Sequence, residues 1–147
     1  MRDPRRGPRV PPPRTGAVET APVKATVVEA VAAPLGTPLA LPNLNALVND
    51  ATLAWEAFRP GIEIHRLYAA PDGQVAALLR YAPGARLPHH RHVGLEHILV
   101  LSGSQEDDRG TYHVGSLLVH PPGTSHAVRS RTGCVVLALW EKPVEFD

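Results

Sequence analysis

The chain has 147 residues, of which 44% are hydrophobic and 20% are charged, as in an ordinary globular protein of one domain. Its formal net charge of +1 argues against nucleic acid or a membrane surface as a partner, and its longest apolar stretch, residues 30–42, is interrupted by prolines. Cys134 is the only cysteine, which excludes an intrachain disulfide, so we expect a cytoplasmic protein.

The chain begins with a segment rich in proline and arginine. Residues 1–22 contain six prolines and five arginines but only two acidic residues, a local charge of +3 that leaves −2 for the remaining residues. A segment with so few large apolar side chains cannot offset its ordering entropy, so we expect it to be disordered. Residues 23–50 are apolar and punctuated by prolines. We expect them to form an N-terminal extension whose first ordered part is NLNALVND, residues 43–50, packed on the domain.

From residue 51 to residue 147 the pattern is that of short β-strands separated by turns. SQEDDRGTY, residues 104–112, predicts a charged hairpin with Gly110 at its turn, and the apolar run around Cys134 predicts a buried, unreactive thiol. Seven or eight short strands without a long helix predict an all-β sandwich or barrel. The strand-like runs are IEIHRLYA (62–69), QVAALLRYA (74–82), EHILVLSG (96–103), GSLLVHPPG (115–123), HAVRS (126–130) and GCVVLALW (133–140).

Four histidines and a glutamate are crowded between residues 89 and 97. On an extended chain His90 and His92 share one face, and Glu96 has the same parity if the chain stays extended. Two imidazoles and a carboxylate on one face would be three ligands of a metal ion, with His126 as the best candidate for a fourth from another strand. A solvent-exposed histidine loop would give the same spacing, so the spacing alone leaves both interpretations open.

Two longer motifs resemble those of the cupin superfamily. The first is Gly84, then His90 and His92, then Glu96, then Gly103, and every spacing fits. The second is Gly115, Pro121, Gly123 and His126, with Ser130 where the family often has asparagine. The resemblance implies a small jelly-roll β-barrel of the RmlC-like cupin type. It also implies one divalent metal ion held by His90, His92, Glu96 and His126.

A closer resemblance, from about Asn43 to Trp140, is to the ChrR-type cupins. The run GLEHILVLSGSQED and the run PPGTSHAVRSRTGC are close to the pattern of that group. It includes a domain of zinc-dependent anti-sigma factors, so the resemblance implies zinc first, with iron, manganese or nickel as alternatives. Those anti-sigma factors carry a helical His/Cys zinc module before the cupin domain. We expect that module to be absent here, which leaves a sensor-type cupin.

Parity and sequence context predict where the side chains of the remaining histidines lie. His89 and His97 have the opposite parity to the ligands and should point outward, whereas no motif supports His65, His113 or His120. These three are expected on the surface or as hydrogen-bonded core residues, and His120 is the one that could support a ligand because it lies near the second motif.

Three functions remain open. The first is a metal-binding sensor or regulatory module, and the second is a metal-dependent dioxygenase or related enzyme acting on a small organic ligand. The third is a structural metal site within a homodimer. Four polar or aromatic residues could orient a substrate, although the strand surface or the core is the expected place for each: Arg80, Tyr81, Arg129 and Trp140.

Overall fold

The computed structural model describes residues 36–147, so the expectations for residues 1–22 and for the extension up to residue 35 lie outside the described residues. The described part contains one short helix and ten strands. These are α1 (Leu44–Val48), β1 (Glu56–Arg59), β2 (Ile62–Ala69), β3 (Val75–Tyr81), β4 (Arg86–Arg91), β5 (Glu96–Asp107), β6 (Gly110–His113), β7 (Leu117–His120), β8 (Ser125–Arg129), β9 (Cys134–Trp140) and β10 (Glu145–Phe146).

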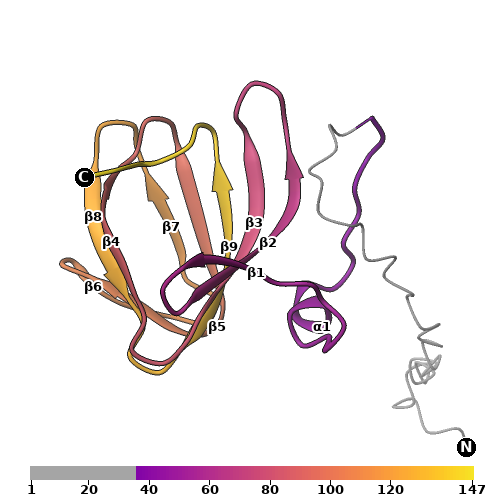
Figure 1. The fold of residues 1–147 in the computed structure, drawn as a ribbon, viewed down its shortest axis with the longest axis horizontal. Helices are drawn as coiled ribbons and strands as arrows, with labels where there is room; N and C mark the ends of the chain where they lie inside the picture. The colour runs from indigo at the N-terminus through magenta and orange to yellow at the C-terminus, as the bar shows by residue number, and fades with distance from the viewer. Residues whose placement is uncertain (1–35) are drawn as a thin grey trace, which may run out of the picture.

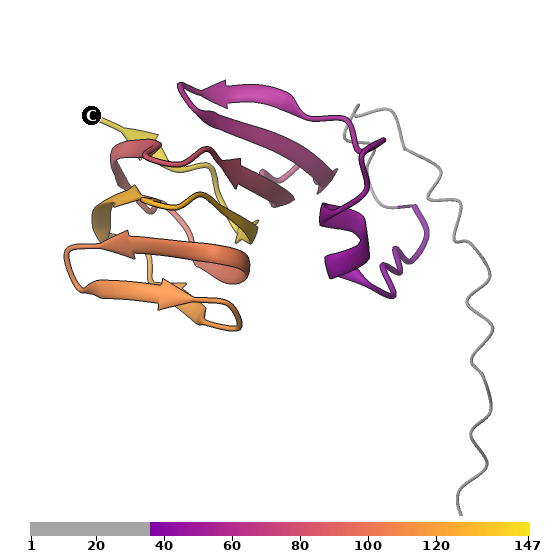
Figure 2. The ribbon, with the colours of Figure 1, turned by 90° about the horizontal axis from the view of Figure 1, so that it is seen from below.

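All strand pairs are antiparallel, and they form a sheet that curls over on itself (Figure 1). The strand order is β1-β2-β3-β9-β5-β8-β4-β10, with β6 and β7 each paired to β5. The curl brings β4 and β8 over the half that contains β3 and β9, with the core between them. Helix α1 lies outside the curl (Figure 2). The predicted small cupin-type β-barrel is therefore confirmed.

Strand β5 carries the chain from one half of the curl to the other. Its first residues pair with β7 and β9, and its last residues pair with β6 and β8. Gly103 lies at this passage with a φ of +66°, and a Cβ atom there would lie 2.0 Å from the carbonyl oxygen of Gly133. Only glycine fits this position, because both the backbone angle and the close approach exclude a side chain.

The core consists of the inward-facing residues of the strands. Alternate residues are buried in the first half of β5 and throughout β7, as expected for strands with one face toward the core. The thiol of Cys134 is 4% exposed, as predicted, and burial raises its pKa. The largest completely buried apolar side chains are those of Ile62, Ile64, Leu78, Leu79, Val100 and Val136.

The structure differs from the sequence-based expectation in three places. β1 and β10 were not expected, because each is too short to show a period. The turn of the charged hairpin is formed by Asp108 and Arg109, whereas Gly110 is the first residue of β6. Within residues 43–50, Leu44–Val48 form a helix capped by Asn43, and none of the helix residues is fully buried. Within residues 36–147, no helix is both long and apolar enough to cross a membrane.

Candidate metal centre

Strand pairing brings the predicted ligands together. His90 in β4 is the direct cross-strand partner of His126 in β8. His92 follows the end of β4, where its backbone N–H donates to the carbonyl of Thr124 and its carbonyl accepts from the N–H of Gly123. His90 and His92 are 2% and 1% exposed, so these two histidines do share the inner face, as the His-x-His spacing predicted.

Glu96 reaches the same place by a different route from the one predicted. The chain is not extended between His92 and Glu96; it bends at residues 93–94, and Glu96 begins a new strand, β5. The bend packs against Glu141, whose carboxylate accepts from the N–H of Leu95 at 2.9 Å. The parity argument for Glu96 was therefore wrong, although its side chain points to the predicted side. Its position follows from β5 and its neighbours.

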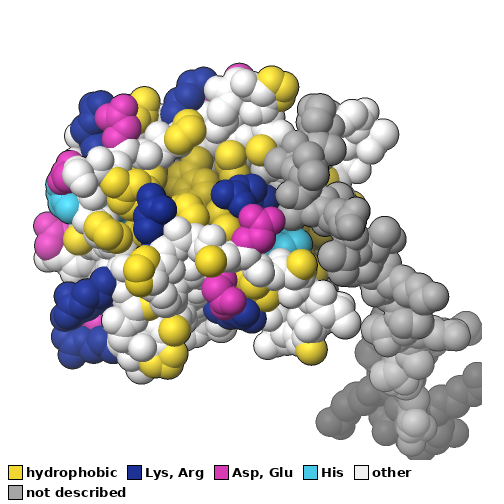
Figure 3. All heavy atoms as spheres, viewed as in Figure 1, with side chains coloured by type: hydrophobic (Ala, Val, Ile, Leu, Met, Phe, Trp, Pro, Cys, Tyr) yellow, Lys and Arg dark blue, Asp and Glu magenta, His cyan; other side chains and the backbone are white. Residues whose placement is uncertain are grey.

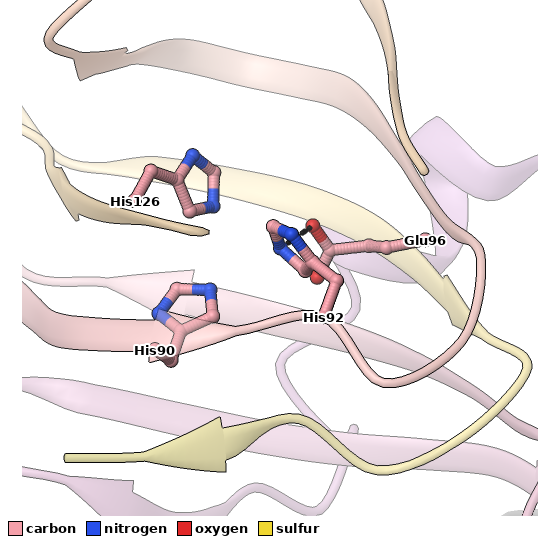
Figure 4. Close-up of side chains that lie close together, drawn as sticks. All are labelled: His90, His92, Glu96 and His126. Carbon is pink, nitrogen blue, oxygen red and sulfur yellow. Dashed lines mark ion pairs between the residues drawn. The ribbon is translucent and has the colours of Figure 1, made fainter. Parts of the chain in front are cut away.

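The four predicted residues form one buried cluster. Each can offer a ligand atom such that all four atoms lie within 4.8 Å of one another, a set able to hold a metal ion. The side chains come from β4, the bend after it, β5 and β8, and they converge on a common space (Figure 4). His89 is exposed, as predicted, and His97 lies on the outer face and is half-buried.

Hydrogen bonds from the Nδ1 atoms orient two of the imidazoles. The Nδ1 of His90 lies 2.9 Å from the carbonyl oxygen of Pro88, which can only accept, so this nitrogen carries the proton. The Nδ1 of His92 lies 3.0 Å from the hydroxyl oxygen of Thr124, whose own proton goes to the carbonyl of Pro121 at 2.7 Å. Each Nε2 atom is therefore left with a free lone pair.

His126 is held in the same manner by a carboxylate. Its Nδ1 lies 3.1 Å from Asp107 Oδ2, and the other oxygen of Asp107 accepts from the hydroxyl of Tyr112. Burial tends to raise the pKa of Asp107, but the hydrogen bonds from His126 and from the N–H of Arg109 outweigh it, and the pKa lies below its ordinary value. An ionised Asp107 accepts only, so His126 also presents an unprotonated Nε2.

The charge states of the cluster suit a cation. Burial lowers the pKa of His90, and it lowers the pKa of His126 to about 4, so both rings are neutral at neutral pH. Burial alone would raise the pKa of Glu96. The hydrogen bond from His120, the contact with His92 and the hydrogen bond from Trp140 outweigh burial, and the pKa lies well below its ordinary value. The result is two neutral imidazoles, those of His90 and His126, beside one carboxylate.

One atom of the cluster lacks a partner of its own. The Nε2 of His92 is completely buried without a hydrogen bond, although it lies 3.0 Å from Glu96 Oε2. Because Nδ1 carries the proton of this ring, a nitrogen lone pair and a carboxylate oxygen face each other there. Two acceptors at this distance repel unless a proton or a metal ion lies between them. The residues present therefore fit a metal ion.

Sequence reasoning undervalued several residues around the cluster. His120 is 4% exposed and its Nδ1 lies 2.7 Å from Glu96 Oε2, and the indole of Trp140 donates to Glu96 Oε1 at 2.6 Å. The proximity of His120 to the second motif was the only signal for it. Nothing in the sequence indicated Trp140, Thr124 or Asp107 as supports, because their roles depend on strand register.

The other candidates lie away from the cluster or in the core. Arg80 pairs with Glu63 and Arg129 with Glu106, both near the surface, as expected. His113 is exposed, and the Nδ1 of the buried His65 lies 2.7 Å from the carbonyl oxygen of Ala54, so both match the structural expectation.

A small cavity adjoins the cluster inside the curl. It has room for about one water molecule. Hydrophobic side chains line the hollow between the two halves of the sheet (Figure 3). The residues that line the cavity are Phe58, Leu79, Tyr81, Leu87, His90, Glu96, Ile98, Gln105, His126, Val128, Trp140, Val144 and Phe146.

Comparisons with known proteins find relatives of similar sequence and fold. The anti-sigma-E factor ChrR of Cereibacter sphaeroides is 31% identical over 78 residues, which are 51% of this chain and 37% of that protein. The match thus spans little more than a third of the length of that curated relative. The solved complex of Rhodobacter sphaeroides SigE with the anti-sigma ChrR matches at 26% identity with a TM-score of 0.54, over 60% of this chain and 48% of that chain.

A further solved structure supports the fold alone. The acetylacetone dioxygenase of Acinetobacter johnsonii has a TM-score of 0.60 at 16% identity, over 75% of this chain and 76% of that chain. The family model of the ChrR cupin-like domain matches residues 43–144, which is most of the chain. That range contains both motifs and all four residues of the cluster. The chain therefore belongs to the ChrR cupin-like family.

Proposed function

We propose that this chain binds one divalent metal ion through His90, His92, Glu96 and His126, and that it acts as a metal-dependent sensor or regulatory module. One observation carries the metal proposal. Each of the three imidazoles donates its Nδ1 proton outward, which leaves three Nε2 lone pairs beside an ionised carboxylate. This is how proteins prepare histidine ligands for a metal.

Zinc is the first choice of metal. Neutral imidazole and carboxylate are ordinary zinc ligands, and four protein ligands suit a closed, tetrahedral site. Iron, manganese and nickel accept the same ligands, and metal availability would then decide. A bound ion would link β4, β5 and β8 through the side chains that bind it. The stability of the barrel would therefore depend on the metal.

The small cavity supports the regulatory role. A space for about one water molecule admits a small oxidant or a similar ligand to the cluster, but no sizeable substrate. The relative ChrR is an anti-sigma factor and has been solved in complex with SigE. By analogy, the readout of this module would be a contact with a protein partner. The absence of nucleic acid and membrane partners and the cytoplasmic location stay predictions.

A metal-dependent dioxygenase is the second candidate. The observation in its favour is the apolar and aromatic lining beside His90 and Glu96, which would suit a small, uncharged organic substrate if the cavity widened. The fold shared with the acetylacetone dioxygenase is compatible with this function. Tyr81 and Gln105 are the polar residues of the lining that could orient such a substrate.

Metal content separates these possibilities. The full chain would be purified without a histidine tag or added metal and analysed for its elements. We expect about one zinc ion per chain. Iron or manganese would instead favour the dioxygenase, and oxygen uptake with small diketones would follow. If the protein binds no metal even after reconstitution, the metal proposal fails.

We also propose that the module forms a homodimer. The outer face of β7, β5 and β9 exposes apolar side chains, among them Leu117 at 62%, Val119 at 48% and Leu139 at 37%. Strand register places them in adjacent rows of one face, and β7 has only β5 as a partner within the described residues. Such a face is best covered by a second copy. Sedimentation would then show a dimer that Leu117→Lys dissociates, and a monomeric wild-type chain would contradict it.

A further inference from the structure

We propose that His120 and Trp140 are positioning residues that form hydrogen bonds with Glu96 from both sides and keep it in the metal centre. This inference rests on the proposed metal site. It predicts that Glu96 is a fixed ligand and not a mobile acid or base.

The register of the sheet places His120 and Trp140 on either side of Glu96. Glu96 begins the central strand of three, and it is the direct cross-strand partner of His120 in β7 and of Trp140 in β9. Directly paired residues point to the same face of a sheet. The three side chains therefore stand in one row on the inner face, with the carboxylate in the middle.

Each neighbour satisfies a different oxygen of the carboxylate. The indole Nε1–H of Trp140 donates to Oε1 at 2.6 Å, and Nδ1 of His120 lies 2.7 Å from Oε2. Oε2 is also the oxygen that faces the unpartnered Nε2 of His92. A carboxylate with both oxygens bound to donors on opposite sides cannot rotate away without breaking a short, charge-assisted hydrogen bond.

His120 also supports the neighbouring ligand. Its ring stacks on that of His92 with the planes 6° apart and the centroids 4.8 Å apart. His120 could itself be a ligand, because Asp107, His120 and His126 form a second group with ligand atoms within 4.8 Å of one another. In the structure, however, Nδ1 of His120 is engaged with Glu96, and His120 does not belong to the group of four whose ligand atoms all lie within 4.8 Å of one another. We therefore assign His120 to support and leave the ligand role as an outcome of the test.

The first test needs no metal. The chain has two tryptophans, so the amide spectrum of the metal-free protein contains two indole N–H signals, and Trp55→Phe assigns them. We expect the Trp140 signal to lie downfield and to move upfield in Glu96→Gln. The Trp55 signal is the internal control. If the Trp140 signal does not change in Glu96→Gln, the proposed positioning of Glu96 by Trp140 is contradicted, whether or not the protein binds a metal.

The second test measures the affinity for cobalt(II) and the visible spectrum of the cobalt protein. Trp140→Phe keeps an aromatic ring but loses the donor, and His120→Leu loses the donor on the other side. We expect each variant to bind cobalt at least about 10-fold more weakly, the cost typical of lost support around a metal ligand. The asparagine variant His120→Asn can place an amide N–H at the position of Nδ1 and should restore most of the affinity. His113→Asn, at an exposed histidine, and Trp55→Phe are the matched controls.

The outcomes distinguish failure of the positioning role, a ligand role for His120, and failure of the metal proposal. Wild-type affinity in both Trp140→Phe and His120→Leu would overturn the positioning role of these two residues and leave the proposed metal site intact. If His120→Asn fails to restore binding and the cobalt spectrum shows one nitrogen ligand fewer, His120 is itself a ligand and its assignment as a positioning residue is wrong. If the wild-type chain binds no cobalt while the indole signal responds to Glu96→Gln, the metal proposal fails, but the hydrogen bond between Trp140 and the carboxylate of Glu96 is confirmed.

Discussion

At the scale of single residues, the cluster is defined by which nitrogen of each imidazole carries the proton. A carbonyl, a hydroxyl and a carboxylate accept the Nδ1 protons of His90, His92 and His126. None of these acceptors belongs to the proposed set of four ligands, yet together they decide that the Nε2 lone pairs face one another. The chemistry of the site therefore depends as much on Pro88, Thr124 and Asp107 as on the ligands.

His92→Ala should lower metal content and thermal stability together. The substitution removes one of the four proposed ligands, and a metal bound only by the folded state stabilises that state. Elemental analysis and thermal unfolding, each before and after treatment with a chelator, would measure both effects. His97→Ala on the outer face is the control and should change neither. Full metal content and an unchanged Tm in His92→Ala would remove this residue from the site.

At the scale of elements, β5 and the segment after β9 matter most. β5 turns from one half of the curl to the other at Gly103 and carries Glu96 at its start. Beyond β9, the two-residue strand β10 lies along β4, so that Phe146 is the cross-strand partner of His90 and lines the cavity. Arg91 and Glu145, which are direct cross-strand partners, form an exposed ion pair at 2.8 Å between β4 and β10.

Gly103→Ala should destabilise the domain by more than about 2 kcal/mol. The left-handed backbone and the carbonyl of Gly133, 2.0 Å from the added Cβ, both oppose a side chain. Gly110→Ala is a matched control in the same hairpin, because a Cβ there meets nothing within 4 Å. Urea unfolding of the two metal-free variants would measure the difference, and equal stabilities would contradict the strain argument.

Phe146→Ala should make the bound metal easier to remove. The ring of Phe146 lies 5.5 Å from that of His90, and the guanidinium of Arg59 covers it at 4.2 Å. Its loss opens the cavity toward solvent without removing a ligand. We expect a chelator to extract the metal several-fold faster than from wild type, whereas Val114→Ala, at a position that is 63% exposed, should leave the rate unchanged. An unchanged rate in Phe146→Ala would show that metal leaves by another route.

At the scale of the whole molecule, the buried histidines couple stability to pH. The pKa of His126 falls from an ordinary value of 6.5 to about 4 on folding, mainly through burial, and that of His90 falls for the same reason. Between these values the unfolded chain binds protons that the folded chain does not. The free energy of unfolding must therefore decrease as the pH falls from 6.5 toward 4.

Unfolding of the metal-free protein at pH 7 and pH 4.5 would test this coupling. We expect lower stability at pH 4.5, and we expect His126→Asn to lose less stability between the two pH values than the wild-type chain. The lowered pKa values of Glu96 and Asp107 act in the same direction but at more acidic pH. Equal stability at both pH values would contradict the burial of neutral imidazoles.

The comparison of sequence and structure shows what each level determines. The strand-like runs separated by turns were enough to predict an all-β fold, and the resemblance carried by the two motifs was enough to predict a cupin barrel and the cluster of His90, His92, Glu96 and His126. A residue's type and its parity along one strand are local properties, so they can be read from the sequence. The route of Glu96, which enters from β5 after a bend, could not be read in this way.

The supports of the cluster were decided by the tertiary structure alone. Trp140 lies 44 residues from Glu96 along the chain, and His120 lies 24 residues away. They meet its carboxylate only because β7 and β9 pair with β5 in one particular register, and a shift by a single residue would turn their side chains to the outer face. Register arises from the packing of the whole curled sheet. The sequence therefore determined which residues could bind a metal, and the fold determined which residues hold them in place.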